Sequence, residues 1–183
     1  MKKKNKRLRH LEELVVFALF GALMFLSAQI DIIPNCHPLA LFIIVLTIIY
    51  RSKALIPLYL YVFLEGLIGG FSLWWVPYLY VWAVLWAISM LIPKRIPEIF
   101  AAVLICAVAG LHGIFFGALY APFQCYVVYN GDWAMTFQWL IYGALFDITH
   151  CISNITASVL AVPLITLICK LSENEYPFKK KKR

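Results

Sequence analysis

The stretch of residues 14–41 limits the fold more than any other part of the chain. It begins as an unbroken apolar run, turns polar near Gln29, breaks at Pro34 and resumes as an apolar run after Pro38. A run of about 20 apolar residues is long enough for a helix to cross a bilayer. The stretch therefore predicts a first membrane span that ends in a short polar cap, with a second span directly after it.

The composition of the whole chain is also typical of a membrane protein. Only 14% of the residues are charged and 63% are hydrophobic, with a mean hydropathy of +0.85. A soluble domain would carry roughly 25% charged residues. We therefore expect an all-α integral membrane protein, with a transmembrane domain over residues 13–171 between basic tails at 1–12 and 172–183.

Apolar runs separated by polar or helix-breaking residues predict six spans. The third span should stop at Gly69-Gly70, and the last should bend near Pro163. A longer loop at 121–136 contains the turn signal Asn130-Gly131. The expected helices cover residues 13–33, 39–50, 54–68, 76–92, 97–120 and 137–171.

The distribution of basic residues predicts the orientation of these spans. The 16 Lys and Arg residues gather near the two ends of the chain and at 51–53 and 94–95. The connections at 34–38, 69–75 and 121–136 contain none. Because cytoplasmic loops carry the excess of Lys and Arg, both termini should lie in the cytoplasm. We expect a multi-pass protein of a bacterial cytoplasmic membrane, whose basic tails contact lipid headgroups rather than nucleic acid.

Polar side chains inside the membrane indicate where function lies. Ionisable groups are costly in hydrocarbon and usually face the interior of a bundle or a cavity. Nearly all of them fall in the predicted outer half or outer loops, which favours a binding cup open to the outside over a channel or proton relay. The expected solute-binding residues are Asp31, Asn35, His37, Glu65, Trp74, Trp75, His112, Gln124, Asp147, His150 and Asn154.

The last predicted helix carries a stripe of small and polar residues that recur every three or four positions and so share one face. The stripe consists of Gly143, Asp147, His150, Asn154, Ala157 and Ala161. It predicts either a wall of the solute site or a hydrogen-bonded seam between helices that binds nothing. Glu65 has two similar interpretations, because it could face an outer cavity or pair with His112 or His150.

Two further motifs each allow more than one interpretation. His112 precedes a Gly113–Gly117 pattern typical of close helix packing, so its ring could bond across that seam or reach solute. Trp74 and Trp75 lie beside an outer connection. There a flat ring could stack on a heterocycle or hold a cation, or belong to the interfacial aromatic belt.

Several kinds of chemistry are not indicated. The chain contains no GxxxxGK[ST], HExxH or GxSxG pattern, so ATP hydrolysis or hydrolase activity of the usual kinds is not expected. The histidines lack close ligand spacing, and we expect neither a metal site nor a cofactor. The five cysteines form no CxxC pair, although Cys36 and Cys125 fall in predicted outer loops where a disulfide could form.

Four features taken together resemble a known family. They are the chain length, the six-helix topology with both ends inside, the small residues Ala18 and Ala22 spaced four apart, and the polar break Asp31-Ile-Ile-Pro-Asn-Cys-His-Pro38. This pattern resembles the S component, the substrate-binding membrane subunit, of energy-coupling factor (ECF) vitamin transporters, and the polar break looks like the family's ligand-covering first loop.

The resemblance implies a mechanism that needs partners. The S component binds a micronutrient from outside, docks on a separate transmembrane coupling subunit, and is reoriented by two ATPase subunits. On this sequence the docking face would be Ala18, Gly21 and Ala22. The chain itself would not be an enzyme, because ATP would be hydrolysed by the partner subunits.

The solute is less well defined. The predicted outer half offers the carboxylates Asp31, Glu65 and Asp147 but no Lys or Arg, which argues against a multiply anionic solute. A flat, nitrogen-rich ring fits better, such as a thiamine-like molecule or a modified nucleobase precursor. Three functions of other classes stay open: a stand-alone secondary permease, an intramembrane enzyme using Asp147, His150 and Glu65, and a purely structural subunit.

Overall fold

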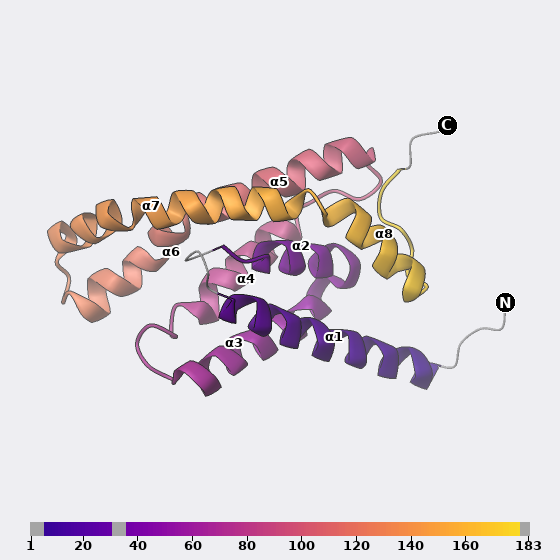
Figure 1. Cartoon of the computed structure of the whole chain (residues 1–183), viewed down its shortest axis with the longest axis horizontal. Coiled ribbons are helices and arrows are strands. Elements are labelled where there is room, and N and C mark those ends of the chain that lie inside the picture. The colour runs from indigo at the N-terminus through magenta and orange to yellow at the C-terminus, as the bar shows by residue number, and fades with distance from the viewer. Residues whose placement is uncertain (1–5, 31–35, 180–183) are drawn as a thin grey trace.

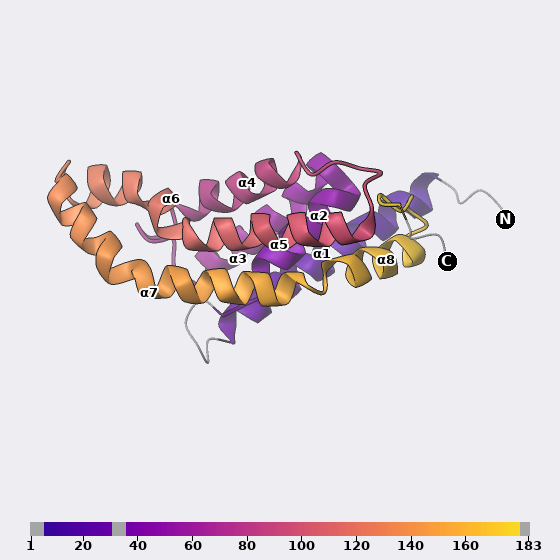
Figure 2. The ribbon, with the colours of Figure 1, turned by 90° about the horizontal axis from the view of Figure 1, so that it is seen from above.

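The computed structural model describes residues 6–30 and 36–179, and this part of the chain is all-helical, as the sequence predicts. Figure 1 shows α1 (Lys6–Gln29) and α3 (Leu55–Gly69) on one side, α5 (Glu98–Ile114) and α7 (Trp133–Ser158) on the other, and α2 (Leu39–Tyr50) between them. The view from above, in Figure 2, again places α5 and α7 side by side. The remaining segments are a 3₁₀ turn (Arg51–Ala54), α4 (Tyr78–Ser89), α6 (Phe116–Phe123), a π-helical turn (Gln124–Val128) and α8 (Ala161–Leu171).

Helix α2 is the buried centre of the molecule. Its sequence, LALFIIVLTIIY, is apolar on every side, and a helix of this kind is stable only when it is surrounded. It contacts α1, α4, α5, α7 and α8, and nearly all its side chains are buried. The first residue of α2 follows directly on His37-Pro38, so these two residues lie at the start of the central helix.

The helices support a membrane protein without confirming six spans. By length and composition, two described stretches could cross a membrane, Arg7–Gln29 and Leu39–Gly69, or up to four if α5 with α6 and α7 with α8 each form one bent span. Arg51 adopts a φ of 56° between α2 and α3 and so interrupts the second stretch. Helix α4 has 12 residues, fewer than the roughly 20 that a full crossing needs. Six spans and their orientation therefore stay predictions.

The predicted chain breaks are largely confirmed. Gly70 ends α3 with a φ of 89°, and Asn130 and Gly131 also adopt positive φ values at the turn before α7. The last predicted helix is bent by 48° between α7 and α8. Pro163 explains this bend, because it cannot donate a hydrogen bond to the carbonyl of Val159 and its ring crowds that carbonyl.

The predicted loop at 121–136 is wrong in most of its length. Helix continues through α6 and the π-helical turn to Val128, and α7 already begins at Trp133. Pro122 lies inside α6, and the π-helical turn that follows it accommodates the irregularity. Asp132 then caps α7 by accepting a hydrogen bond from Met135 N at 3.0 Å, a cap that the sequence signal did not identify.

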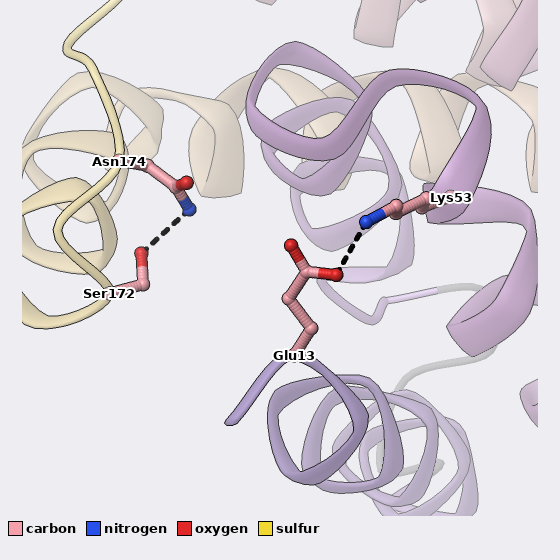
Figure 3. Close-up of polar contacts among 4 residues, drawn as sticks. All are labelled: Glu13, Lys53, Ser172 and Asn174. Carbon is pink, nitrogen blue, oxygen red and sulfur yellow. Dashed lines mark hydrogen bonds and ion pairs between the residues drawn. The ribbon is translucent and has the colours of Figure 1, made fainter. Parts of the chain in front are cut away.

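Within the described residues, basic segments that are distant in sequence are joined by contacts near the end of the molecule where α8 and the first turns of α1 lie (Figure 1, right). Arg51 Nη2 donates to the carbonyl of Met90 at 2.6 Å, and Arg95 N donates to the carbonyl of Pro177 at 2.7 Å. Figure 3 shows the Lys53 ammonium pointing toward the Glu13 carboxylate of α1. Segments that are distant in sequence therefore form one cationic end.

Residues 172–179, the described part of the basic tail expected at 172–183, pack against the rest of the described chain. This segment turns back at Ser172 and Asn174, which share a hydrogen bond (Figure 3). Lys179 N then donates to the carbonyl of Ile96 at 2.9 Å, and the Phe178 ring is buried in the core. Residues 172–179 thus form a strap across the start of α5.

Candidate functional site

Three of the predicted site histidines come together from three separate elements. His37 precedes α2, His112 lies in α5, and His150 lies in α7. The ring centroids of His37 and His150 are 5.4 Å apart, and those of His112 and His150 are 6.3 Å apart. His112 and His150 are buried, whereas His37 is only partly covered. No short sequence spacing links these positions, so the fold alone assembles them.

Two aromatic rings that we did not predict complete this cluster. Trp82 of α4 lies 5.4 Å from the His112 ring and 6.1 Å from the His150 ring. Phe116 of α6 lies 4.7 Å from the His150 ring and 5.4 Å from the Trp82 ring. We call His37, Trp82, His112, Phe116 and His150 the histidine cluster. A sequence signal for Trp82 existed, since Tyr78 and Trp82 are one helical turn apart on the face that α4 buries.

The cluster contains buried polar atoms that lack partners within the described residues. These atoms are His150 Nδ1, His150 Nε2, His112 Nδ1 and Trp82 Nε1. His112 Nε2 lies 3.1 Å from the carbonyl of Val81. Because a carbonyl oxygen only accepts, this nitrogen must donate, which leaves His112 Nδ1 as an acceptor in the neutral ring. The cluster therefore offers an indole donor, an imidazole acceptor, and a second imidazole with one nitrogen of each kind.

Asp147 and Asn154 take part in helix packing rather than in the cluster. Asn154 Nδ2 donates to the carbonyl of Ala109 at 3.1 Å, and Gly117 N donates to Asp147 Oδ1 at 3.1 Å. At Gly113 a Cβ atom would lie only 2.7 Å from backbone atoms of Cys151. The predicted GxxxG pattern is thus a close seam between α7 and the α5–α6 pair, and the polar stripe of α7 supplies contacts to it.

Glu65 also lies outside the cluster. Gln29 Nε2 donates to its carboxylate at 3.3 Å, across the α1–α3 interface. A pairing with His112 or His150, which the sequence allowed, is therefore not the one observed. Glu65, Asp147 and Asn154 do not line one common hollow, because Asp147 lines a groove of about 310 Å³ between α6 and α7 whose lining includes neither of the others.

Three of the remaining predicted residues, Trp74, Trp75 and Gln124, lie in segments outside the histidine cluster. Trp75 Nε1 donates to the carbonyl of Val62 at 2.7 Å, which fixes the connection before α4 against α3. The Trp74 ring lies edge-on to Tyr78 at 5.5 Å and is partly exposed. Gln124 lies in the π-helical turn after α6. Asp31 and Asn35 lie outside the described residues.

The predicted docking face divides into two parts. Ala18 is exposed and Ala22 is partly exposed on the outer side of α1. Gly21 is buried instead, and a Cβ atom there would lie 2.6 Å from Leu60 of α3. Gly21 therefore allows α1 and α3 to pack closely and is not available to another protein.

The cysteines and the possible metal ligands are also placed by the structure. Cys36 is exposed, Cys125 is buried, and both are free thiols, so a disulfide between them is not formed. Within residues 6–30 and 36–179, no group of three or more His, Cys, Asp or Glu side chains is arranged to hold a metal ion. The cluster offers hydrogen-bonding nitrogens and aromatic ring faces.

Comparison with known proteins adds no assignment. No family model matches the chain, and no curated protein or solved structure matches it.

Proposed function

We propose that this chain is the substrate-binding membrane subunit of an ECF-type importer. It would capture a small nitrogen heterocycle from outside the cell, in the histidine cluster. The observation that carries the proposal is the set of buried ring nitrogens on Trp82, His112 and His150 that have no partner among the described residues. Leaving a buried polar group unpaired costs about 1–3 kcal/mol. A bound solute that pairs with these nitrogens would recover that free energy.

The chemistry of the cluster favours a neutral, flat solute. Trp82 and Phe116 supply aromatic surface, and the imidazoles can pair with either a donor or an acceptor. The carboxylates of Glu65 and Asp147 are engaged elsewhere by Gln29 and Gly117. A permanent cation would therefore find no counter-charge in the cluster. Of the two solute types that the sequence suggests, the modified nucleobase precursor is favoured over a thiamine-like cation.

His37 offers a route to the cluster. Its ring contacts His150, and the same residue lines a surface groove of about 430 Å³ together with Cys36, Thr149 and Ser153. The rings of the cluster pack against each other at 4.7–6.4 Å, so a solute must separate them to bind. Displacement of the His37 ring would open the cluster from this groove, and its return would close the cluster over the solute.

The other surfaces fit a subunit driven by partners. The basic segments gather at one end, as the positive-inside rule requires of a cytoplasmic face. A groove of about 530 Å³ runs between α1 and α8, lined by apolar residues that include Val15 and Leu19. This groove adjoins the exposed Ala18, and we assign it to the membrane coupling subunit, whose two ATPase partners would supply the energy.

The test begins with mass spectrometry of small molecules released from the purified protein, followed by uptake of the identified compound. Trp82→Phe removes the indole donor of the cluster and should abolish co-purification and uptake. Trp86→Phe is the matched control, because the Trp86 indole donates to the carbonyl of Arg51 at the basic end. If Trp82→Phe retains the compound at wild-type occupancy, the cluster is not the binding site.

Uptake should also require the coupling and ATPase subunits. Uptake by this chain alone would show a stand-alone permease. A chemically altered compound released from the protein would show an intramembrane enzyme. A protein that carries no compound, and whose cluster variants leave uptake unchanged, would be a structural subunit.

A further inference from the structure

The groove between α6 and α7 is a second recess, separate from the histidine cluster. It has a volume of about 310 Å³. Phe116 lies between the two, because its ring contacts His150 on one side and lines the groove on the other. The wall contains a chain of neighbouring rings, with Phe116 and Tyr120 at 5.4 Å and Tyr120 and Trp139 at 6.4 Å.

Asp147 gives this recess a charged group. Its Oδ1 atom accepts the hydrogen bond from Gly117 N, and a Cβ atom at Gly117 would lie 2.6 Å from Oδ2. The carboxylate is thus held against the α6 backbone at the base of the aromatic wall. The sequence contains no Lys or Arg between Arg95 and Lys170. No Lys or Arg side chain of α5, α6 or α7 can therefore neutralise it.

Gly143 keeps the groove open. It lines the recess one helical turn before Asp147, and a Cβ atom built there would meet nothing within 4 Å. Gly143 is therefore not required for helix packing, unlike Gly113, and a larger side chain at this position would fill the recess.

We propose that the α6–α7 groove binds an organic ammonium cation. The faces of Trp and Tyr rings attract cations, and the attraction is greatest where water is excluded. A carboxylate held beside such rings adds a counter-charge with a fixed position. The proposal is independent of the solute in the histidine cluster, which presents no carboxylate. The ammonium group belongs either to a free solute or to the headgroup of a membrane lipid.

The experiment uses the full chain in nanodiscs of phosphatidylglycerol, which has no ammonium group, with empty nanodiscs as the baseline. Choline is the probe, and 3,3-dimethylbutan-1-ol is its neutral isostere. Calorimetric titration should give choline an affinity at least about tenfold above that of the isostere. Asp147→Asn keeps the acceptor for Gly117 N and should remove this preference, and Gly143→Leu should weaken binding by filling the groove.

Controls separate the proposal from other effects. Glu65→Gln neutralises a carboxylate outside the groove and should leave choline binding unchanged. Replacing half of the lipid by phosphatidylethanolamine distinguishes the two sources of the ammonium group, a free solute and a lipid headgroup. Weaker choline binding then identifies a lipid ammonium as the occupant, and unchanged binding identifies a free solute. Equal affinity for choline and the isostere, or an unchanged preference in Asp147→Asn, would overturn the proposal.

Discussion

Replacing Gly113 by alanine tests the close approach of α5 and α7 that assembles the site. The new Cβ atom would lie 2.7 Å from Cα and N of Cys151 and 2.8 Å from the carbonyl carbon of His150. All three are backbone atoms, so no rotamer change can relieve the overlap and the two helices must separate. Overpacking of this kind costs about 1–3 kcal/mol. Alanine also favours the helix over glycine by up to about 1 kcal/mol, which offsets part of this loss of stability.

The expected net loss for Gly113→Ala is therefore about 0–2 kcal/mol once the full helix preference of alanine is subtracted. For a chain of this size, each kcal/mol shifts the melting temperature by about 2–4 °C, so we expect a fall of up to about 8 °C. Two glycines provide matched controls. At Gly143 a Cβ atom meets nothing within 4 Å, so Gly143→Ala should raise the melting temperature by a few degrees. At Gly110 it meets side-chain atoms rather than backbone, Cδ1 and Cγ1 of Ile155 at 2.8 Å and Sγ of Cys151 at 3.6 Å, so Gly110→Ala should change the melting temperature little.

The measurement is thermal unfolding of the three variants and the wild type in the same detergent and lipid. Because His112 lies on α5 and His150 on α7, the separation should also weaken retention of the co-purified solute in Gly113→Ala alone. A melting temperature for Gly113→Ala equal to or above that of Gly143→Ala would refute the backbone contact as described.

Three further predictions concern other parts of the structure. Phe178→Ala should lower the free energy of unfolding by about 3 kcal/mol or more, and with it the melting temperature, because the ring is buried in the core. Tyr126→Ala is the control and should change the melting temperature little, because that side chain is 65% exposed. Lys53→Met breaks only a solvent-exposed ion pair with Glu13 and should change the free energy of unfolding by less than about 1 kcal/mol in chemical denaturation. A membrane-impermeant maleimide applied to intact cells should label Cys36 in the wild-type chain. It should not label the cysteine of a Lys53→Cys variant from which Cys36 has been removed. The reverse labelling pattern would invert the proposed orientation.

Helix positions were predictable where local signals were strong. Gly70 and Asn130-Gly131 adopt the positive φ values that stop or turn a chain, and Pro163 accounts for the bend before α8. The loop at 121–136 is wrong because a proline usually ends a helix, whereas here the apolar residues after Pro122 continue it. A π-helical turn accommodates the proline.

The sequence by itself determined the all-helical class, the presence of apolar helices long enough to cross a membrane, and the segregation of basic residues to a few segments, since these depend on composition and local pattern. Only the tertiary structure decided which polar residues meet. His37, Trp82, His112 and His150 come from four different segments, the residues before α2 and helices α4, α5 and α7, and share no spacing in the sequence. Their proximity depends on glycines such as Gly113, where one backbone packs directly on another. Sequence periodicity can indicate which face of a helix is packed, but it cannot indicate which partner that face contacts.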